Sequence, residues 1–230
     1  DLIKNIPEIK VYGLKYTINQ LILDGVSEKN LHVLMPHKKM NFTKELSIFP
    51  ITVNHSVPDS CMYVLNTPDG AIVYTGDFII DPSMMGAYHM DLGKIAYVGK
   101  QGVLALLGES SFAENIGHTS PNHHLSSFFK KLIAKTDGRI IFSVLPVHLY
   151  TIEGIFNAAK NSHRKVVVMG KKLQNIINMA IKENYINIEE GQIGDLSNVN
   201  DHNSILLISD DRSNAYNMFE RIIAGNDKFI

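Results

Sequence analysis

The sequence predicts an α/β protein with two unlike parts. In residues 8–98 the apolar runs are short and lie between turn signals, which is typical of a β-rich sheet. From about residue 120 onward, apolar positions at helical spacing alternate with short apolar runs, and this alternation predicts parallel strands joined by helices. We therefore expect residues 1–119 and 120–230 to form separate domains.

The strands expected in the first part follow one another closely. They are residues 31–35, 45–53, 61–65 and 71–74. Asp69-Gly70 lies between the last two runs and is a favoured turn dipeptide, so it predicts a β-hairpin.

The second part repeats a helix and strand cycle. The expected strands are residues 140–144, 166–169, 204–208 and 228–230, and the helices carry apolar faces within residues 125–133, 149–159, 173–181 and 215–223. Leu125, Phe128 and Phe129 belong to the first of these faces. Residues 186–203 have no clear period and are expected to form a loop or a short strand.

Composition limits the classes of protein. A net charge of −1 on 230 residues excludes a globally basic nucleic-acid binder, so RNA would have to bind local patches. The single cysteine, Cys61, fits a reducing compartment, and no signal peptide or run of about 18 apolar residues is present, so we expect a cytoplasmic protein without a membrane span. Because the chain starts in mid-pattern without Met, we expect it to be a piece of a longer protein.

Two polar residues stand at the ends of strands that can pair. His55 lies in the run VNHSVPDS of residues 53–60, and Asp77 lies in the run TGDF of residues 75–78. Imidazole nitrogen and carboxylate oxygen are ligands of hydrolytic zinc sites. No His-x-His-x-Asp-His cluster precedes them.

These two segments resemble the third and fourth metal-ligand motifs of the metallo-β-lactamase fold. Residues 102–119 are similar to the motif that opens the β-CASP insertion of bacterial ribonuclease J, and residues 138–143, His148 and residues 164–170 follow in that family's order. The resemblance implies part of a metallo-β-lactamase β-sandwich, followed by a Rossmann-like β-CASP domain that is incomplete at its C-terminal end.

The resemblance also implies roles for individual residues. Asp77 corresponds to the ligand that bridges two zinc ions, His55 to a ligand of one zinc, and Glu109 to a carboxylate that orients a metal-bound imidazole. On this interpretation Asp77 and Glu109 are catalytic, and Ser110 and His148 bind substrate.

Each assignment has a plainer alternative. A histidine at a strand end is often structural, Glu109 fits a helix cap, and His148 fits a polar cap in a strand-to-helix loop. Gly170-Lys171-Lys172 opens a helix and fits either an anion site or a solvated basic turn. We interpret His118, His123 and His124 as residues of a loop and a helix start.

Several residues depart from the family's pattern. They are Glu109 for Asp, Phe112 for Asn, Leu149 for the Arg after His148, and Asp210-Asp211 in a loop that is usually small and neutral. The two carboxylates and the lost arginine reduce the attraction for RNA.

The resemblance implies that the parent protein hydrolyses RNA phosphodiester bonds as a 5′-to-3′ exonuclease and endonuclease, with two zinc ions. It also implies a homo- or hetero-oligomer with another ribonuclease J-type subunit. The chain alone supplies only His55 and Asp77 as ligands, so we expect it to bind zinc weakly and to be inactive. One alternative is a degenerate, non-catalytic paralogue that acts as a scaffold in an RNA-decay complex. Another is a small-molecule hydrolase such as a thioesterase, which the helix and strand repeats after residue 120 disfavour.

Overall fold

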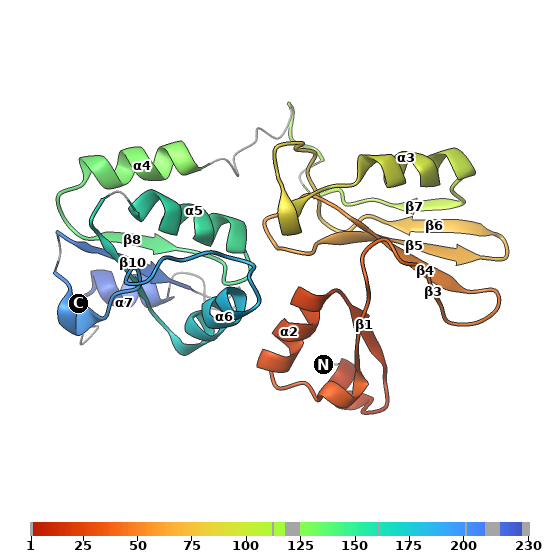
Figure 1. Cartoon of the computed structure of the whole chain (residues 1–230), viewed down its shortest axis with the longest axis horizontal. Coiled ribbons are helices and arrows are strands. Elements are labelled where there is room, and N and C mark those ends of the chain that lie inside the picture. The colour runs from red at the N-terminus through yellow and green to blue at the C-terminus, as the bar shows by residue number, and fades with distance from the viewer. Residues whose placement is uncertain are drawn as a thin grey trace. The chain divides into compact units, whose positions relative to one another are not determined.

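A computed structural model describes residues 2–111, 113–117, 125–160, 162–200, 202–209 and 217–226 (Figure 1). The chain divides into two compact units, Asp1–Ser120 and Pro121–Ile230. Within the described residues, no helix is long and apolar enough to cross a membrane.

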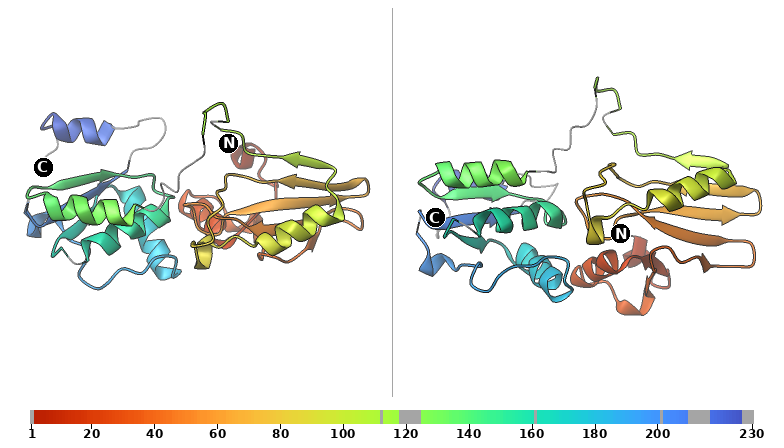
Figure 2. Two further views of the ribbon diagram at one scale, coloured as in Figure 1. Left: turned by 90° about the horizontal axis from the view of Figure 1, so that it is seen from above. Right: turned by 45° about the horizontal axis from the view of Figure 1, so that its top comes forward.

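A five-stranded sheet dominates the first unit, in the order β3-β4-β5-β6-β7. The strands are β3 (Met40–Asn41), β4 (Ser47–Thr52), β5 (Cys61–Thr67), β6 (Gly70–Tyr74) and β7 (Ala105–Leu107). Neighbours from β3 to β6 are antiparallel, whereas β6 and β7 are parallel. Helix α3 (Leu92–Gln101) covers one face, as Figure 2 shows. The core between that face and α3 contains Ile51, Met62, Val64 and Val73 of the sheet and Val98 of the helix.

The predicted hairpin joins β5 to β6. Thr67 pairs with Gly70 across the turn, and the Thr67 hydroxyl donates to the Gly70 carbonyl at 2.8 Å. Gly70 has a φ of 142°, and a Cβ there would lie 3.1 Å from the Leu104 side chain. Glycine is therefore required both by the backbone angle and by the close approach of residue 104.

Smaller elements complete the first unit. They are α1 (Leu2–Asn5), β1 (Val11–Gly13), α2 (Lys15–Leu23), β2 (Leu31–Val33) and the 3-10 helices η1 (Glu28–Asn30) and η2 (Gly86–Tyr88). The strand expected at residues 31–35 is shorter than predicted and pairs in parallel with β1, not with the large sheet. Helices α2 and α3 were not predicted. Asp91 caps α3 by accepting the Lys94 N–H at 2.9 Å.

The second unit contains the predicted parallel sheet, in the order β8-β10-β9. The strands are β8 (Ile140–Ser143), β9 (Lys165–Val168) and β10 (Ser204–Ile208). Every residue of the central strand β10 is buried, which explains why it is apolar almost throughout. The strand expected at residues 228–230 lies outside the described residues.

Helices cover this sheet (Figures 1 and 2). They are α4 (Ser126–Lys135), α5 (Leu149–Ala159), α6 (Lys171–Lys182) and α7 (Asn217–Ile223), with the 3-10 helix η3 (Leu196–Asn198). Phe129 of α4 lies edge-on to Phe142 of β8, with ring centroids 5.2 Å apart. Phe128, which was predicted on the buried face, is instead 55% exposed. Consecutive helical residues point about 100° apart, so only one of the two rings reaches the core.

Arg164 binds the end of α4 to the sheet. Its side chain is 9% exposed, and its guanidinium donates to the carbonyls of Thr136, Gly138 (2.7 Å) and Ser204 (3.4 Å). These carbonyls follow α4, precede β8 and begin β10. Arg164 thereby links the end of α4 to the starts of β8 and β10.

Candidate active site

Sheet pairing brings the ends of β4 and β6 to one edge. Both strands run antiparallel to β5, so they point the same way and end at the same end of the sheet, on either side of β5. An isolated antiparallel bridge then joins Asn54 to Ile79, with the Ile79 N–H donating to the Asn54 carbonyl at 3.0 Å. The structure therefore places the segments that carry His55 and Asp77 next to each other.

The His55 imidazole and the Asp77 carboxylate interact electrostatically. Burial lowers the pKa of the half-buried His55, and the negative charge of Asp77 acts against that shift. Asp77 itself is exposed.

Ser60 orients the imidazole. Its hydroxyl donates to the Val57 carbonyl at 2.8 Å and lies 3.4 Å from His55 Nδ1. Because the hydroxyl proton is already used, the Ser60 oxygen can accept from Nδ1–H. That tautomer leaves the lone pair of His55 on Nε2, the atom that would then bind a metal.

Thr75 ties the Asp77 loop to the loop that follows β7. Its N–H donates to the Leu107 carbonyl at 3.1 Å, and its buried hydroxyl accepts the Glu109 N–H at 3.0 Å while donating to the Gly76 carbonyl at 2.8 Å. The Glu109 backbone is thereby bonded to Thr75, which lies two residues before Asp77 in the chain.

The carboxylate of Glu109 turns to its own loop. It is exposed and accepts the side-chain and backbone hydrogens of Ser111, and these bonds hold its pKa below the usual range. The bond closes a local turn, and no helix begins among the described residues 110–111 and 113–117, so the contact is not the helix cap that was the plainer alternative. The structure thus places the Glu109 backbone at the site, while its carboxylate bonds locally.

The two expected substrate-binding residues lie in different units. Ser110 is exposed in the first unit, and its carbonyl accepts the Ala113 N–H at 3.1 Å. His148 is the N-cap residue of α5 in the second unit, where its carbonyl accepts the N–H groups of Thr151 and Ile152 at 3.1 and 3.2 Å. Lys171 and Lys172 are exposed at the start of α6. Phe112, His118, His123, His124, Asp210 and Asp211 lie outside the described residues.

The donors present fit only part of a zinc site. Imidazole and carboxylate are both zinc ligands, yet a catalytic zinc usually has three protein ligands. Across the part of the chain that the structure describes, no group of three or more His, Cys, Asp or Glu side chains could hold a metal ion. His55 and Asp77 could contribute to such a centre but do not complete it.

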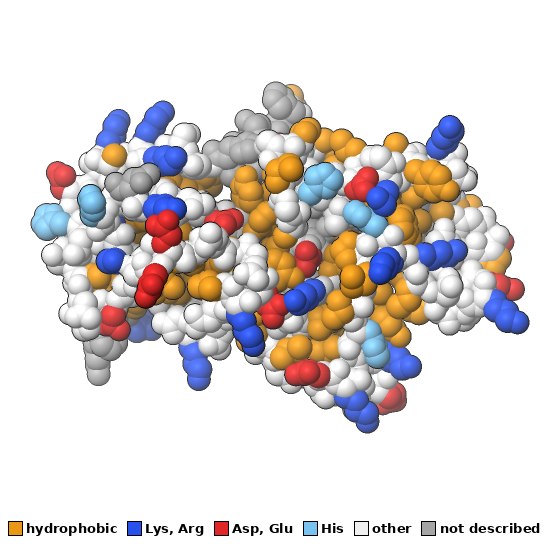
Figure 3. All heavy atoms as spheres, viewed as in Figure 1, with side chains coloured by type: hydrophobic (Ala, Val, Ile, Leu, Met, Phe, Trp, Pro, Cys, Tyr) orange, Lys and Arg blue, Asp and Glu red, His pale blue; other side chains and the backbone are white. Residues whose placement is uncertain are grey.

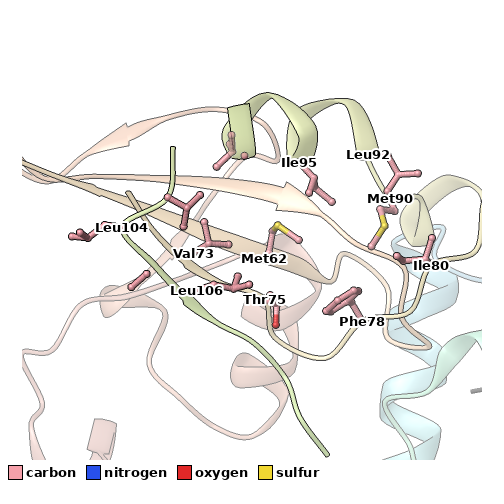
Figure 4. Close-up of a pocket in the computed structure, with 14 residues that line it drawn as sticks. Met62, Val73, Thr75, Phe78, Ile80, Met90, Leu92, Ile95, Leu104 and Leu106 are labelled. Carbon is pink, nitrogen blue, oxygen red and sulfur yellow. The ribbon is translucent and has the colours of Figure 1, made fainter. Parts of the chain in front are cut away.

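An apolar cavity of about 450 Å³ adjoins the site (Figure 4). Met62 and Val73 of the sheet, Ile95 of α3 and Leu106 of β7 lie around it, and Thr75 is a rare polar group in its wall. This lining offers few partners to a phosphate, so the polar chemistry belongs to the adjacent loop with Asp77.

Comparisons with known proteins identify the family. Residues 137–230 match the β-CASP domain of ribonuclease J. Ribonuclease J 2 of Staphylococcus saprophyticus and that of Staphylococcus aureus are each 31% identical over 206 residues, which cover 86% of this chain and 37% of each relative. The chain belongs to the ribonuclease J family. It spans little more than a third of the length of these ribonuclease J relatives.

A solved structure supports the fold alone. The crystal structure of a protein of unknown function from Enterococcus faecalis V583 aligns with a TM-score of 0.60 at 17% identity, covering 96% of this chain and 63% of that one. The predicted resemblance to ribonuclease J and the predicted α/β fold with a β-CASP domain are both confirmed.

Sequence reasoning missed the polar residues that hold the site together. Asn54 and Thr75 are buried next to or near the candidate ligands and bond to backbone groups far along the chain. A weak signal was available, because Asn54 directly precedes His55 and follows the apolar run that ends at Val53.

Proposed function

We propose that this chain is part of a metal-dependent ribonuclease that hydrolyses RNA phosphodiester bonds, with 5′-to-3′ exonuclease and endonuclease modes. The main support is the bridge between Asn54 and Ile79, which brings the segments that carry His55 and Asp77 together at one end of the sheet, in a chain of the ribonuclease J family. Imidazole and carboxylate at this edge are the groups that such a hydrolase needs.

Two zinc ions are the proposed cofactors. When bound, zinc supplies a hydroxide nucleophile at neutral pH and takes up negative charge on the phosphate. His55 and Asp77 would provide two ligands, and further ligands would have to come from residues other than the described ones. Glu109 would act on the neighbouring imidazole only after its carboxylate leaves Ser111. Ser110 and His148 are proposed to contact RNA.

The 230-residue chain alone is proposed to bind zinc weakly and to leave RNA intact, because its described donors do not complete a metal site. Elemental analysis of the purified chain tests this. Two tightly held zinc ions per chain would refute it.

For the complete protein we propose a cytoplasmic location and an oligomer with a like or related ribonuclease J subunit. The single cysteine fits a reducing compartment. Size-exclusion chromatography with light scattering tests the oligomer, and a monomer at micromolar concentration would contradict it.

A non-catalytic scaffold paralogue is the second candidate. One observation favours it: the Glu109 carboxylate accepts a hydrogen bond from Ser111, where a catalytic site would have it orient a metal-binding imidazole. A scaffold would bind RNA-decay proteins without cutting RNA, so an activity assay separates the two.

The test uses the complete protein encoded by the gene and 5′-monophosphorylated RNA with Mn²⁺ or Zn²⁺. We expect the wild type to cleave the RNA and Asp77→Ala to lose at least about 100-fold in rate, because a metal-binding carboxylate is removed. Asn66→Ala is the control, since it removes a side-chain amide from the same sheet that bonds only to Ser47. Equal rates for wild type and Asp77→Ala would overturn the proposed function.

A further inference from the structure

A buried amide lies directly behind the candidate site. The side chain of Asn54 is 1% exposed, and the residue stands immediately before His55. Its Oδ1 accepts the Asp81 N–H at 2.9 Å, and its Nδ2 donates to the Tyr88 carbonyl at 2.6 Å. With the backbone bond to Ile79, one residue makes three hydrogen bonds to the segment that follows Asp77.

The segment that Asn54 holds has its own internal order. Asp81 is 8% exposed, and its Oδ1 accepts the Ser83 N–H at 2.8 Å and the Ser83 hydroxyl at 2.7 Å. This turn precedes η2, which contributes the Tyr88 carbonyl. The Asn54 side chain therefore bonds to two points of a locally ordered segment.

The loop that carries His55 is held at its other end as well. The Asp59 N–H donates to the Ala87 carbonyl at 2.8 Å, one residue before the carbonyl that Asn54 uses. Residues 54 and 59 thus both bond to the segment at residues 79–88. His55 lies between these two anchors, and Asp77 lies just before the segment.

The chemistry of this position requires an amide. The buried Tyr88 carbonyl needs a donor and the buried Asp81 N–H needs an acceptor, and a primary amide of this length supplies both. An apolar side chain would remove both of these hydrogen bonds from a buried place.

We propose that Asn54 is a positioning residue that sets the distance and direction between the His55 imidazole and the Asp77 carboxylate. It does so by fixing the strand end before His55 to the loop after Asp77. This inference rests on the proposed function and adds to it the group that assembles the site.

The test compares Asn54→Ala with Asn66→Ala in the complete protein. We expect Asn54→Ala to lower kcat on 5′-monophosphorylated RNA by about 10–100-fold while KM changes less than about threefold, because groups that orient ligands act on the reacting centre and not on overall RNA affinity. We also expect the amides of Ile79 and Asp81 to exchange hydrogen faster. Asn66→Ala removes an Nδ2 group that donates to the Ser47 hydroxyl at 3.2 Å, and it should change neither the kinetic constants nor the exchange of these two amides.

A conservative variant guards against simple misfolding. Asn54→Gln keeps a primary amide on a longer side chain, so it retains an acceptor for the Asp81 N–H and a donor for the Tyr88 carbonyl, and we expect a smaller loss of kcat than in Asn54→Ala. Rates are compared at equal distance below each variant's Tm.

Two results would overturn the proposal. One is an Asn54→Ala kcat loss no larger than that of Asn66→Ala, and the other is unchanged amide exchange at Ile79 and Asp81. If the wild type itself does not cleave RNA, the proposed function fails and the catalytic role of Asn54 fails with it. The exchange measurement then still decides whether Asn54 holds the loop.

Discussion

The Thr75 hydroxyl accepts the backbone N–H of Glu109 at 3.0 Å, and it is one of the few polar groups buried in the first unit. Together with the bond from the Thr75 N–H to the Leu107 carbonyl, it connects the loop after β6 to the end of β7 and the loop that follows. Because Asp77 is two residues from Thr75, the backbone at position 109 keeps a fixed place relative to the candidate ligand.

Removing this hydroxyl should loosen both loops. Thr75→Val keeps the shape but leaves the Glu109 N–H without its acceptor, so we expect a loss of about 1–2 kcal/mol in unfolding free energy. Thr75→Ser keeps the hydroxyl and should lose less. Urea unfolding measures both variants, and a Thr75→Val stability equal to the wild type would contradict this account.

Arg164 should be essential to the second unit. Arg164→Met removes a buried guanidinium and leaves the Gly138 and Thr136 carbonyls without their donor, so we expect a loss of about 2–4 kcal/mol. Lys172→Met, on an exposed residue of α6, serves as the control and should change stability by less than about 0.5 kcal/mol. Thermal unfolding followed by circular dichroism compares the two variants. Equal Tm values would show that the Arg164 hydrogen bonds do not stabilise the second unit.

Cys61 should be slow to react. Burial raises the pKa of its thiol to about 11, so at pH 8 only about one thiol in a thousand is ionised. We expect iodoacetamide to modify the native protein about 100-fold more slowly than the protein unfolded in urea. Mass spectrometry over time gives both modification rates. Equal rates would show that burial does not lower the reactivity of the Cys61 thiol.

Stability should fall on mild acidification. Burial, followed by the charge of Lys94, lowers the pKa of His37 in spite of Asp91, and His37 Nε2 accepts the Thr52 N–H at 3.3 Å. The folded-state pKa of His37 lies below the unfolded value of about 6.5. The stability that neutral His37 contributes is therefore fully present above about pH 6.5 and is lost as pH falls through the folded-state pKa.

Burial lowers the pKa of His55 too, so its contribution has the same sign. We therefore expect urea unfolding to show lower stability at pH 5.5 than at pH 7.5, with a smaller difference in His37→Gln. If the unfolding free energy of His37→Gln fell as much between pH 7.5 and pH 5.5 as that of the wild type, His37 would not be a cause of the pH dependence.

Much of the fold follows from local patterns. The runs that became β4, β5 and β6 are bounded by turn residues, and Asp69-Gly70 marks the hairpin, so short-range signals located them. The buried strands β8, β9 and β10 are short apolar runs between helical periods.

Other elements were missed for physical reasons. In α3 the glycines Gly93 and Gly99 and the β-branched Ile95 and Val98 lower the helix propensity, so the segment did not stand out as a helix. The cap formed by Asp91 and the Lys94 N–H was the available signal. At Phe128 the period alone did not decide which of two adjacent rings faces the sheet.

The site was only partly predictable. His55 and Asp77 follow strands that pair through β5, so their proximity could be inferred from the hairpin pattern. Asn54 and Thr75 bond to backbone groups 27 to 34 residues away, and such bonds leave no periodic trace. The direction of the Glu109 carboxylate depends on the local turn with Ser111.

The most direct test of the central claim is the Mn²⁺ dependence of RNA cleavage by the complete protein. Removing the imidazole in His55→Ala should raise the half-saturating Mn²⁺ concentration by at least about tenfold, because a ligand donor is lost beside Asp77. An activation curve that is the same for His55→Ala and the wild type would contradict a metal-dependent nuclease centre at this edge of the sheet.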